Sequence, residues 1–216
     1  MVNKTALVLV ADGTEEMEAV ITIDVLVRAS IKVTVASIKP EASGAEKEEA
    51  VTCSRGVRLV PDTHLSKLSL DSDHFDALVI PGGAPGAKAM AESPLVKQWV
   101  RAYFQPQQQQ QQSRLVAAIC AGPTVLQAAE VGQGWAITSH PSVKDQLTEY
   151  YRYKEGPSVV VSSDAGGEEE KSVAKGKLIT SRGPGTAFAF ALTIAERLVG
   201  KEVVDKIRGP MMMMHD

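Results

Sequence analysis

Cysteine is the most nucleophilic residue type in this sequence, and its two copies stand in different settings. Cys120 directly follows the apolar run Leu115–Ile119 and precedes the small residues Ala121 and Gly122, where a helix is expected to begin. Amide groups at a helix N-terminus stabilise an anion, so this position predicts a lowered thiol pKa and a populated thiolate. A lone buried cysteine is also commonly just a small hydrophobic residue. The spacing alone leaves a reactive and a structural Cys120 both open.

Cys53 is the weaker candidate of the two. It lies just after an acidic segment, and we expect it at a surface or at an interface. Two cysteines are too few for a disulfide framework or a four-thiolate zinc site. His64 and His74 stand apart from other metal-ligating residues. No metal site is therefore predicted.

Further polar side chains and glycines follow other predicted strands. Glu15 and Glu16 come after the first strand and are interpreted as solvated residues in the first turn of a helix, where the helix dipole favours acids. Pro81–Gly86 is interpreted as a loop in which the backbone can approach a ligand closely. His140 and Arg182–Gly185 end two later strands. In parallel sheets such strand ends share one edge, which is where ligands bind.

The elements that must position these residues alternate along the chain. The expected strands are the apolar runs Thr5–Ala11, Lys32–Ser37, Ala77–Ile80, Leu115–Ile119, Ala136–Thr138, Val159–Ser162 and Leu178–Ser181. Helical patterns cover Glu15–Ala29, Ser93–Phe104, Pro123–Ala129 and Ala187–Val199, the last ending at Gly200. Short, nearly all-apolar strands alternating with helices predict an α/β fold, with a mostly parallel sheet covered on both faces.

Composition narrows the function. The chain has 216 residues, of which 44% are hydrophobic and 23% charged, and its net charge is −3. It lacks an overall basic field for a phosphate backbone, so no nucleic-acid partner is expected. No apolar run is long enough for a membrane span or a signal-peptide core, which predicts a cytoplasmic protein, with the nucleus as a second location. The glycine-rich turns match neither a P-loop nor a dinucleotide fingerprint.

Three segments differ from their surroundings: 41–50 and 164–171 are acidic, and 105–112 is almost pure glutamine. We interpret them as surface loop insertions in one domain spanning residues 1–216, because loops tolerate insertions at little cost. The two acidic segments carry a net charge of −3 each, which leaves the rest of the chain at +3.

Taken together, these motifs resemble the DJ-1 (Parkinson-associated) branch of the DJ-1/PfpI superfamily, whose fold is a flavodoxin-like three-layer sandwich. The matching segments are Glu15-Glu16-Met17-Glu18, Cys53-Ser54-Arg55, Pro81-Gly82-Gly83, Ala118-Ile119-Cys120-Ala121-Gly122-Pro123, Ser139-His140-Pro141 and Ser181-Arg182-Gly183-Pro184-Gly185-Thr186. The resemblance spans the chain apart from the three insertions and the tail Met211–Met214, which we interpret as a cover for apolar surface, with the dimer contact as one candidate.

The resemblance implies roles for individual residues. Cys120 corresponds to the family's reactive cysteine, Glu18 to its partner carboxylate and His140 to a third polar group. A thiolate and a carboxylate in contact should share one proton. Backbone amides of Gly82, Gly83 and Ala121 would receive an oxyanion. Arg28, Arg55 and Pro184 correspond to residues that line the site or the homodimer interface.

Two activities are compatible with this resemblance. One is a cofactor-independent glyoxalase, or a deglycase, that acts on methylglyoxal, glyoxal or glycated substrates without glutathione. The other is an oxidative-stress sensor or redox-regulated chaperone based on Cys120 oxidation. A peptidase is disfavoured, because peptidase-like relatives usually carry histidine directly after the cysteine, where this chain has Ala121.

Overall fold

The structure is a computed structural model that describes residues 4–39, 49–104, 114–163 and 177–213. The insertions 105–112 and 164–171 lie outside these residues, as does most of segment 41–50. Met214 of the methionine tail also lies outside them. No helix in the described ranges is both long enough and apolar enough to cross a membrane.

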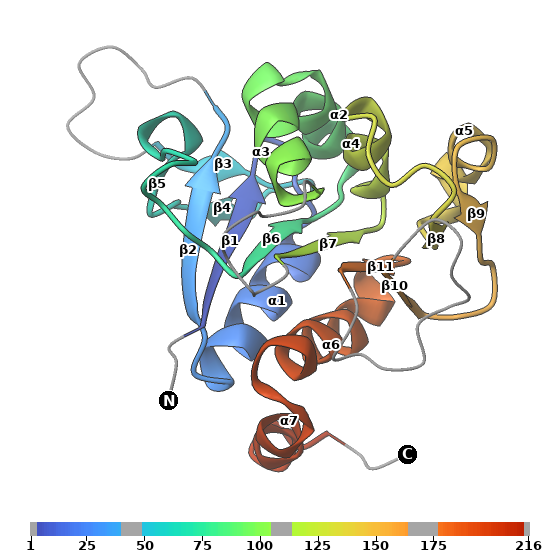
Figure 1. Ribbon diagram of the computed structural model, residues 1–216. Coiled ribbons are helices and arrows are strands. Elements are labelled where there is room, and N and C mark those ends of the chain that lie inside the picture. The colour runs from blue at the N-terminus through green and yellow to red at the C-terminus, as the bar shows by residue number, and fades with distance from the viewer. Residues whose placement is uncertain (1–3, 40–48, 105–113, 164–176, 214–216) are drawn as a thin grey trace.

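A seven-stranded sheet forms the middle of the molecule, in the order β10-β11-β7-β6-β1-β2-β5 (Figure 1). Its strands are β1 (Thr5–Val10), β2 (Lys32–Ser37), β5 (Thr63–His64), β6 (Ala77–Ile80), β7 (Leu115–Ile119), β10 (Val159–Ser162) and β11 (Leu178–Ser181). All neighbouring strands are parallel except β10 and β11. The prediction of an α/β fold with a mostly parallel sheet is confirmed.

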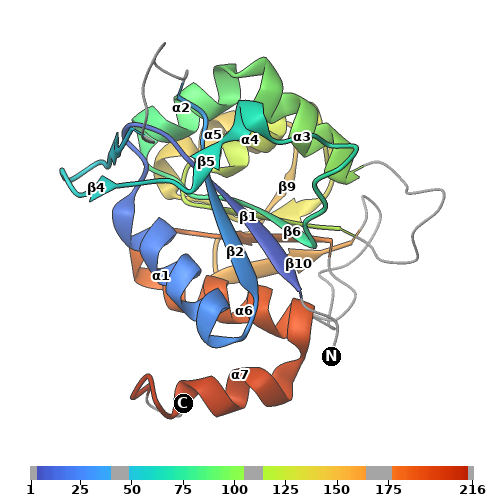
Figure 2. The ribbon, with the colours of Figure 1, turned by 90° about the vertical axis from the view of Figure 1, so that its left-hand side faces the viewer.

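Helices cover both faces of this sheet, as Figure 2 shows. One face carries α1 (Glu16–Arg28) and α6 (Ala187–Val199), with α7 (Lys201–Arg208) packed against α6. The other face carries α2 (Ala84–Glu92), α3 (Pro94–Phe104) and α4 (Pro123–Ala128). Smaller elements are β3 (Val51–Thr52), β4 (Arg58–Leu59), η1 (Leu65–Lys67), β8 (Ala136–Ile137), η2 (Pro141–Val143), α5 (Lys144–Leu147), β9 (Arg152–Tyr153) and η4 (Pro184–Thr186).

The central strands are apolar on both sides because each side faces a helix layer. In β1, Leu7 and Leu9 pack with α2, α3 and α4, whereas Ala6 and Val8 pack with α1 and α6. All four side chains are fully buried. Successive residues of a strand point to opposite faces, so a strand covered twice has no polar side. This double burial rigidly fixes the strand ends that carry the site.

Several elements differ from the expectation. Residues 81–86 are not all loop, because α2 begins at Ala84 with Pro85 in its first turn, a position that suits proline. The strand expected at 136–138 forms as β8, but it pairs with β9 outside the main sheet. Helix α7 was not predicted. It is amphipathic, with Val203, Val204 and Ile207 packed against the core, but it has only eight residues and directly follows Gly200, which signals the end of α6.

Candidate functional site

Cys120 lies on a sharp turn between β7 and α4, at the carboxyl edge of the sheet. Its backbone adopts a φ of +63°, which is unusual for a residue with a side chain and strains the turn. Two hydrogen bonds hold it there: its N–H donates to Ser181 O at 3.0 Å, and its carbonyl accepts from His140 N at 2.9 Å. The neighbouring strand end and the β8 segment therefore fix the orientation of the cysteine.

Glu18 meets this turn from the first turn of α1. Its side chain is fully buried, and Oε2 accepts a hydrogen bond from the Gly82 N–H at 2.7 Å. Oε1 is buried and makes no hydrogen bond with any described residue. Burial raises the pKa of Glu18 to about 7, although the hydrogen bonds from Gly82 and Cys120 act in the opposite direction. A carboxyl group with this pKa can exchange a proton at neutral pH.

Gly82 allows the two side chains to meet. A Cβ atom added at this position would lie 2.5 Å from the Cys120 Cβ and 2.7 Å from Glu18 Oε2. Both distances are shorter than van der Waals contact, so a side chain here would force the pair apart. Glycine thus keeps the carboxyl group, the cysteine and the backbone in one compact cluster.

Besides the Glu18 carboxyl group, the backbone N–H groups of Gly83 and Ala121 face the Cys120 sulfur. Gly83 has a φ of +83°, and a Cβ there would lie 2.1 Å from the Gly13 carbonyl oxygen. Position 83 therefore requires glycine, both for its positive φ and because the adjacent backbone leaves no space for a side chain. Of the three backbone amides expected to bind an oxyanion, those of Gly83 and Ala121 lie at the cysteine. The third, of Gly82, instead donates its hydrogen bond to Glu18.

The thiol itself differs from the expectation of a lowered pKa. Burial raises the pKa of Cys120 to about 12, and the charge of Glu18 acts in the same direction. The amides of Gly83 and Ala121 oppose this rise without outweighing it. Helix α4 has only six residues, so its dipole offsets little of the cost of burying an anion. Two buried charges in contact are unfavourable, so Glu18 and Cys120 hold at least one proton between them near neutral pH.

Glu15 and Glu16 are not solvated, contrary to the expectation. Glu15 caps α1, because its carboxylate accepts the Glu18 N–H at 2.8 Å. Glu16 is 7% exposed and accepts hydrogen bonds from the Ser54 hydroxyl and the Arg55 N–H, both at 2.7 Å. Burial acts to raise the pKa of Glu16, but the hydrogen bonds to its carboxylate outweigh this effect and lower it. The two acids therefore fix the start of α1, and with it the approach of Glu18 to the cysteine.

His140 reaches the site through its backbone. Its N–H donates to the Cys120 carbonyl, whereas its exposed ring directs Nδ1 towards the Ser142 hydroxyl at 2.8 Å and accepts the Ser142 N–H at 3.2 Å. A Cβ added at Gly183 would lie 3.6 Å from the ring. The imidazole therefore stands at the rim of the site, between η2 and the loop that follows β11.

The remaining candidate residues have other partners or surroundings. Arg28 is exposed and pairs with Asp24 at 2.7 Å. Arg55 is exposed and donates from Nη1 to the Ser54 carbonyl at 3.2 Å. Pro184 is partly buried in η4. Cys53 is only 4% exposed and packs with Val10, Ala19, Val35 and Val51, so the surface position, one of its two expected settings, is wrong. The other, an interface, stays a prediction.

Thr186 is a supporting residue that the sequence analysis missed. Its Oγ1 accepts the N–H groups of Arg182 and Gly183 at 3.2 and 3.1 Å, and it lies 2.7 Å from the Ser181 hydroxyl. This network holds the strand end whose carbonyl binds the Cys120 N–H. Threonine at the start of a helix after a glycine-rich loop is a local signal for such backbone bonding.

Among the described residues, no group of three or more His, Cys, Asp or Glu side chains gathers as a metal ion would require.

Comparison with known proteins agrees with this geometry. The DJ-1/PfpI family model matches residues 4–197. Protein dj-1beta of Drosophila melanogaster is 45% identical over 99% of this chain and 100% of its own length, and its crystal structure has a TM-score of 0.81 over 99% and 100% of the two chains.

Two further relatives carry informative names. Glutathione-independent glyoxalase DJR-1.2 of Caenorhabditis elegans is 36% identical over 97% of this chain and 96% of its own. The structure titled Toxoplasma gondii DJ-1, oxidized, is 33% identical, with a TM-score of 0.79 over 98% of this chain and 100% of its own. The match of the family model to residues 4–197, together with relatives that are 36–45% identical over nearly their full length, shows that the chain belongs to the DJ-1/PfpI family.

Proposed function

We propose that this protein is a glutathione-independent glyoxalase that converts methylglyoxal to lactate and glyoxal to glycolate at Cys120. The observation that carries the proposal is the contact between a buried carboxyl group with a pKa of about 7 and a cysteine facing two backbone N–H groups. A relative that is 36% identical over nearly its full length bears the same activity in its name.

The first step is addition of the thiol to the aldehyde. Glu18 as carboxylate takes the thiol proton while the sulfur bonds to the aldehyde carbon, and the carbonyl oxygen becomes an oxyanion. The N–H groups of Gly83 and Ala121 stabilise this oxyanion, which takes the proton from Glu18 to give a hemithioacetal and leaves Glu18 as a carboxylate again. The raised thiol pKa is no obstacle here, because proton transfer to Glu18 accompanies the attack.

The second step moves hydrogen between the two substrate carbons. A base removes the proton from the former aldehyde carbon to form an enediol, and a proton returns to the neighbouring carbon to give a thioester. Glu18 suits this shuttle because its pKa lies near neutral pH. Water then hydrolyses the thioester, releasing the hydroxy acid and restoring the thiol. His140, at the rim, assists by exchanging protons with solvent.

The test is lactate formation from methylglyoxal by purified protein without glutathione. Cys120→Ser should abolish lactate formation, since the serine hydroxyl is a poorer nucleophile than the thiol and the substitution should leave the fold unchanged. Cys53→Ser is the matched control and should retain turnover. Equal turnover by Cys120→Ser and the wild type would exclude the proposed mechanism.

A second candidate function is sensing of peroxide through Cys120. The observation that favours it is the difference between the two thiols: Cys120 is partly exposed and Cys53 is buried. A relative whose structure is titled as oxidized belongs to the same family. Access favours oxidation of Cys120, whereas its raised thiol pKa acts against it. Protonated Glu18 can donate a hydrogen bond to a sulfinate oxygen and so stabilise the oxidised form. Mass spectrometry after mild peroxide should find oxygen on Cys120 before Cys53, and the reverse order would contradict this function.

The proposal includes a homodimer. Met17, Val20 and Val27 of α1 are 51%, 46% and 56% exposed, and Phe188 of α6 is 44% exposed. Helices α1 and α6 pack against one another, so these side chains belong to neighbouring helices. Exposed apolar side chains on adjacent helices are typical of a subunit contact. Sedimentation equilibrium should give twice the chain mass.

A further inference from the structure

Both polar groups of the Cys120 backbone are anchored by other segments. Its N–H donates to the Ser181 carbonyl at the end of β11, and its carbonyl accepts the His140 N–H from the segment after β8. The φ of +63° is strained, and a strained conformation persists only where the surrounding structure fixes it from several sides. Cys120 therefore keeps its turn only if the two anchoring segments hold a constant position relative to one another.

A hydroxyl group joins these two segments. Thr180, next to Ser181 in β11, accepts the Thr138 N–H at its Oγ1 atom at 2.9 Å, and Thr138 lies directly after β8. Both threonines are fully buried. Together with the two bonds to Cys120, this bond closes a ring that contains residues 120, 138–140, 180 and 181. The ring fixes the two anchors of the cysteine to each other.

The bond from Thr180 matters because β8 lies outside the main sheet. In the described part of the chain, β8 forms its ladder with β9 and not with the seven-stranded sheet. Buried hydroxyl groups connect it to that sheet: Ser162 of β10 donates to the Ala136 carbonyl at 3.0 Å, and Thr180 binds the other end. Ser162 thus holds the start of β8, whereas Thr180 holds the end that leads to His140.

The place of Thr180 in its strand explains its direction. Leu178, two residues earlier, belongs to the same buried cluster as Ile137 of β8. Residues two apart in a strand point to the same face, so Thr180 also points towards β8. A buried N–H needs an acceptor, and the threonine hydroxyl supplies it. Valine has nearly the same shape but would leave the Thr138 N–H unpaired.

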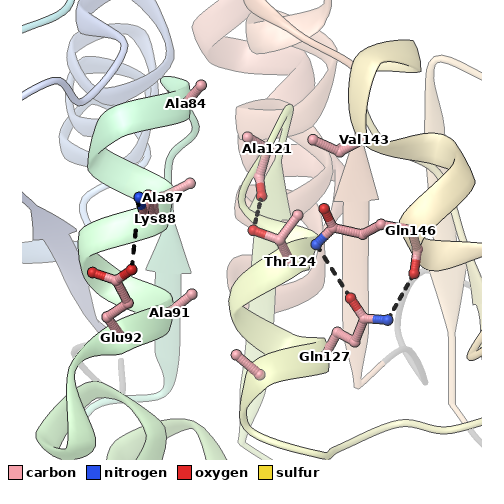
Figure 3. A pocket seen from close by; sticks show the side chains of 11 residues that line it. Ala84, Ala87, Lys88, Ala91, Glu92, Ala121, Thr124, Gln127, Val143 and Gln146 are labelled. Atoms are coloured by element: carbon pink, nitrogen blue, oxygen red, sulfur yellow. Dashed lines mark hydrogen bonds and ion pairs between the residues drawn. The ribbon is translucent and has the colours of Figure 1, made fainter.

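The ring also directs a group that the proposed mechanism uses. The Ala121 N–H lies in the same planar peptide unit as the Cys120 carbonyl, so the bond from His140 to that carbonyl fixes the direction of this N–H. The Ala121 N–H faces the Cys120 sulfur. On the other side of the residue, the Ala121 carbonyl accepts the Thr124 hydroxyl at 2.8 Å (Figure 3). A shift of His140 would therefore turn the amide away from the position at which it stabilises the oxyanion.

We propose that Thr180 is a positioning residue for the reaction at Cys120 and acts through the backbone of Ser181 and His140. The consequence for turnover rests on the proposed glyoxalase function. The side chain of Thr180 points to the face opposite α1 and α6, the layer with which the Cys120 side chain packs. It therefore acts from behind the site, by keeping the two anchors of the cysteine together.

The experiment replaces Thr180 by valine and measures methylglyoxal turnover. The value of kcat should fall at least about tenfold and KM should change less, because a small misplacement of reacting groups costs up to about 100-fold in rate. Thr180→Ser keeps the hydroxyl and should restore most of the turnover. In Thr180→Val, the amide hydrogens of Cys120 and His140 should exchange with solvent at least about tenfold faster, because their hydrogen bonds open more often. Nuclear magnetic resonance measures this exchange.

Ser162→Ala is the matched control. It removes the buried hydroxyl that holds the start of β8, at the end remote from His140. It should lower the unfolding temperature as Thr180→Val does, while kcat and the two exchange rates stay near those of the wild type. Thr186→Val is the second test variant, in case Thr180→Val does not fold. Its Oγ1 lies 2.7 Å from the Ser181 hydroxyl, so its loss should also speed exchange of the Cys120 amide.

Unchanged amide exchange or unchanged turnover in Thr180→Val would overturn the inference. Equal losses of turnover in Thr180→Val and Ser162→Ala would overturn it as well, because they would trace the effect to stability alone. Absence of methylglyoxal turnover in the wild type would refute the proposed function alone, since amide exchange tests the ring without catalysis.

Discussion

Replacing Glu18 by glutamine should stabilise the protein at neutral and alkaline pH while removing its activity. Burial raises the pKa of Glu18 from 4.5 to about 7. At about 1.36 kcal/mol per pKa unit, this rise corresponds to about 3 kcal/mol that the folded protein loses when the buried carboxyl group ionises. Glutamine has nearly the same shape and cannot ionise, and its carbonyl oxygen can still accept the Gly82 N–H.

The sign follows from the protons bound in each state. Between pH 4.5 and about 7 the folded protein retains a proton on Glu18 that the unfolded chain has released, so the stability of the wild type falls as pH rises through this range. The difference in free energy of unfolding between Glu18→Gln and the wild type should therefore be small below pH 4.5. It should grow through this interval and level off above about pH 7, in favour of the variant.

The assay is urea unfolding of both proteins between about pH 4 and pH 8 at one fixed protein concentration, since assembly adds to apparent stability. Glu149→Gln serves as the control, because Glu149 is exposed and its replacement should change stability little at any pH. A constant difference between Glu18→Gln and the wild type across the pH range would refute the reasoning. It would mean that Glu18 ionises in the folded protein as easily as in the unfolded chain.

Two further predictions concern the same cluster. In Glu18→Gln, the pKa of the Cys120 thiol should fall, because the charge of Glu18 is one cause of its rise. The ultraviolet absorbance of the thiolate during a pH titration measures this pKa. An unchanged titration midpoint would contradict the coupling between the two groups. Gly82→Ala should lower turnover at least about tenfold and destabilise the fold, because the added methyl group overlaps the Cys120 and Glu18 side chains. Kinetics and thermal unfolding test this. The control is Gly156→Ala, where an added Cβ meets no atom within 4 Å.

Local sequence was sufficient for most of the main elements. Apolar runs bounded by turns predicted six of the seven strands in the sheet, including β7 and β11 at their observed bounds. Proline at the start of α3 and Gly200 at the end of α6 marked helix limits correctly. Strand β5 was missed because it has only two residues, which is too short for any periodicity.

The position of Cys120 after a strand and before a helix was also predictable from sequence. Its φ of +63° requires the hydrogen bonds from two segments distant in the chain, so no local pattern gives it. The solvent exposure expected of Glu15 and Glu16, and the surface position considered for Cys53, were wrong for a related reason. Acids at a helix start and a cysteine beside an acidic segment look solvated locally, but the loop around Ser54 folds onto the start of α1, where it binds Glu16 and packs Cys53 against the core.

The sequence by itself determined the α/β fold, the edge at which the chemistry collects and the residues resembling those of a known family. Only the tertiary structure decided the electrostatics of the site. The pKa values of Glu18 and Cys120 depend on burial and on their contact across Gly82, which brings together residues far apart in the chain. Desolvation depends on what surrounds a group in space, and sequence neighbours do not report it.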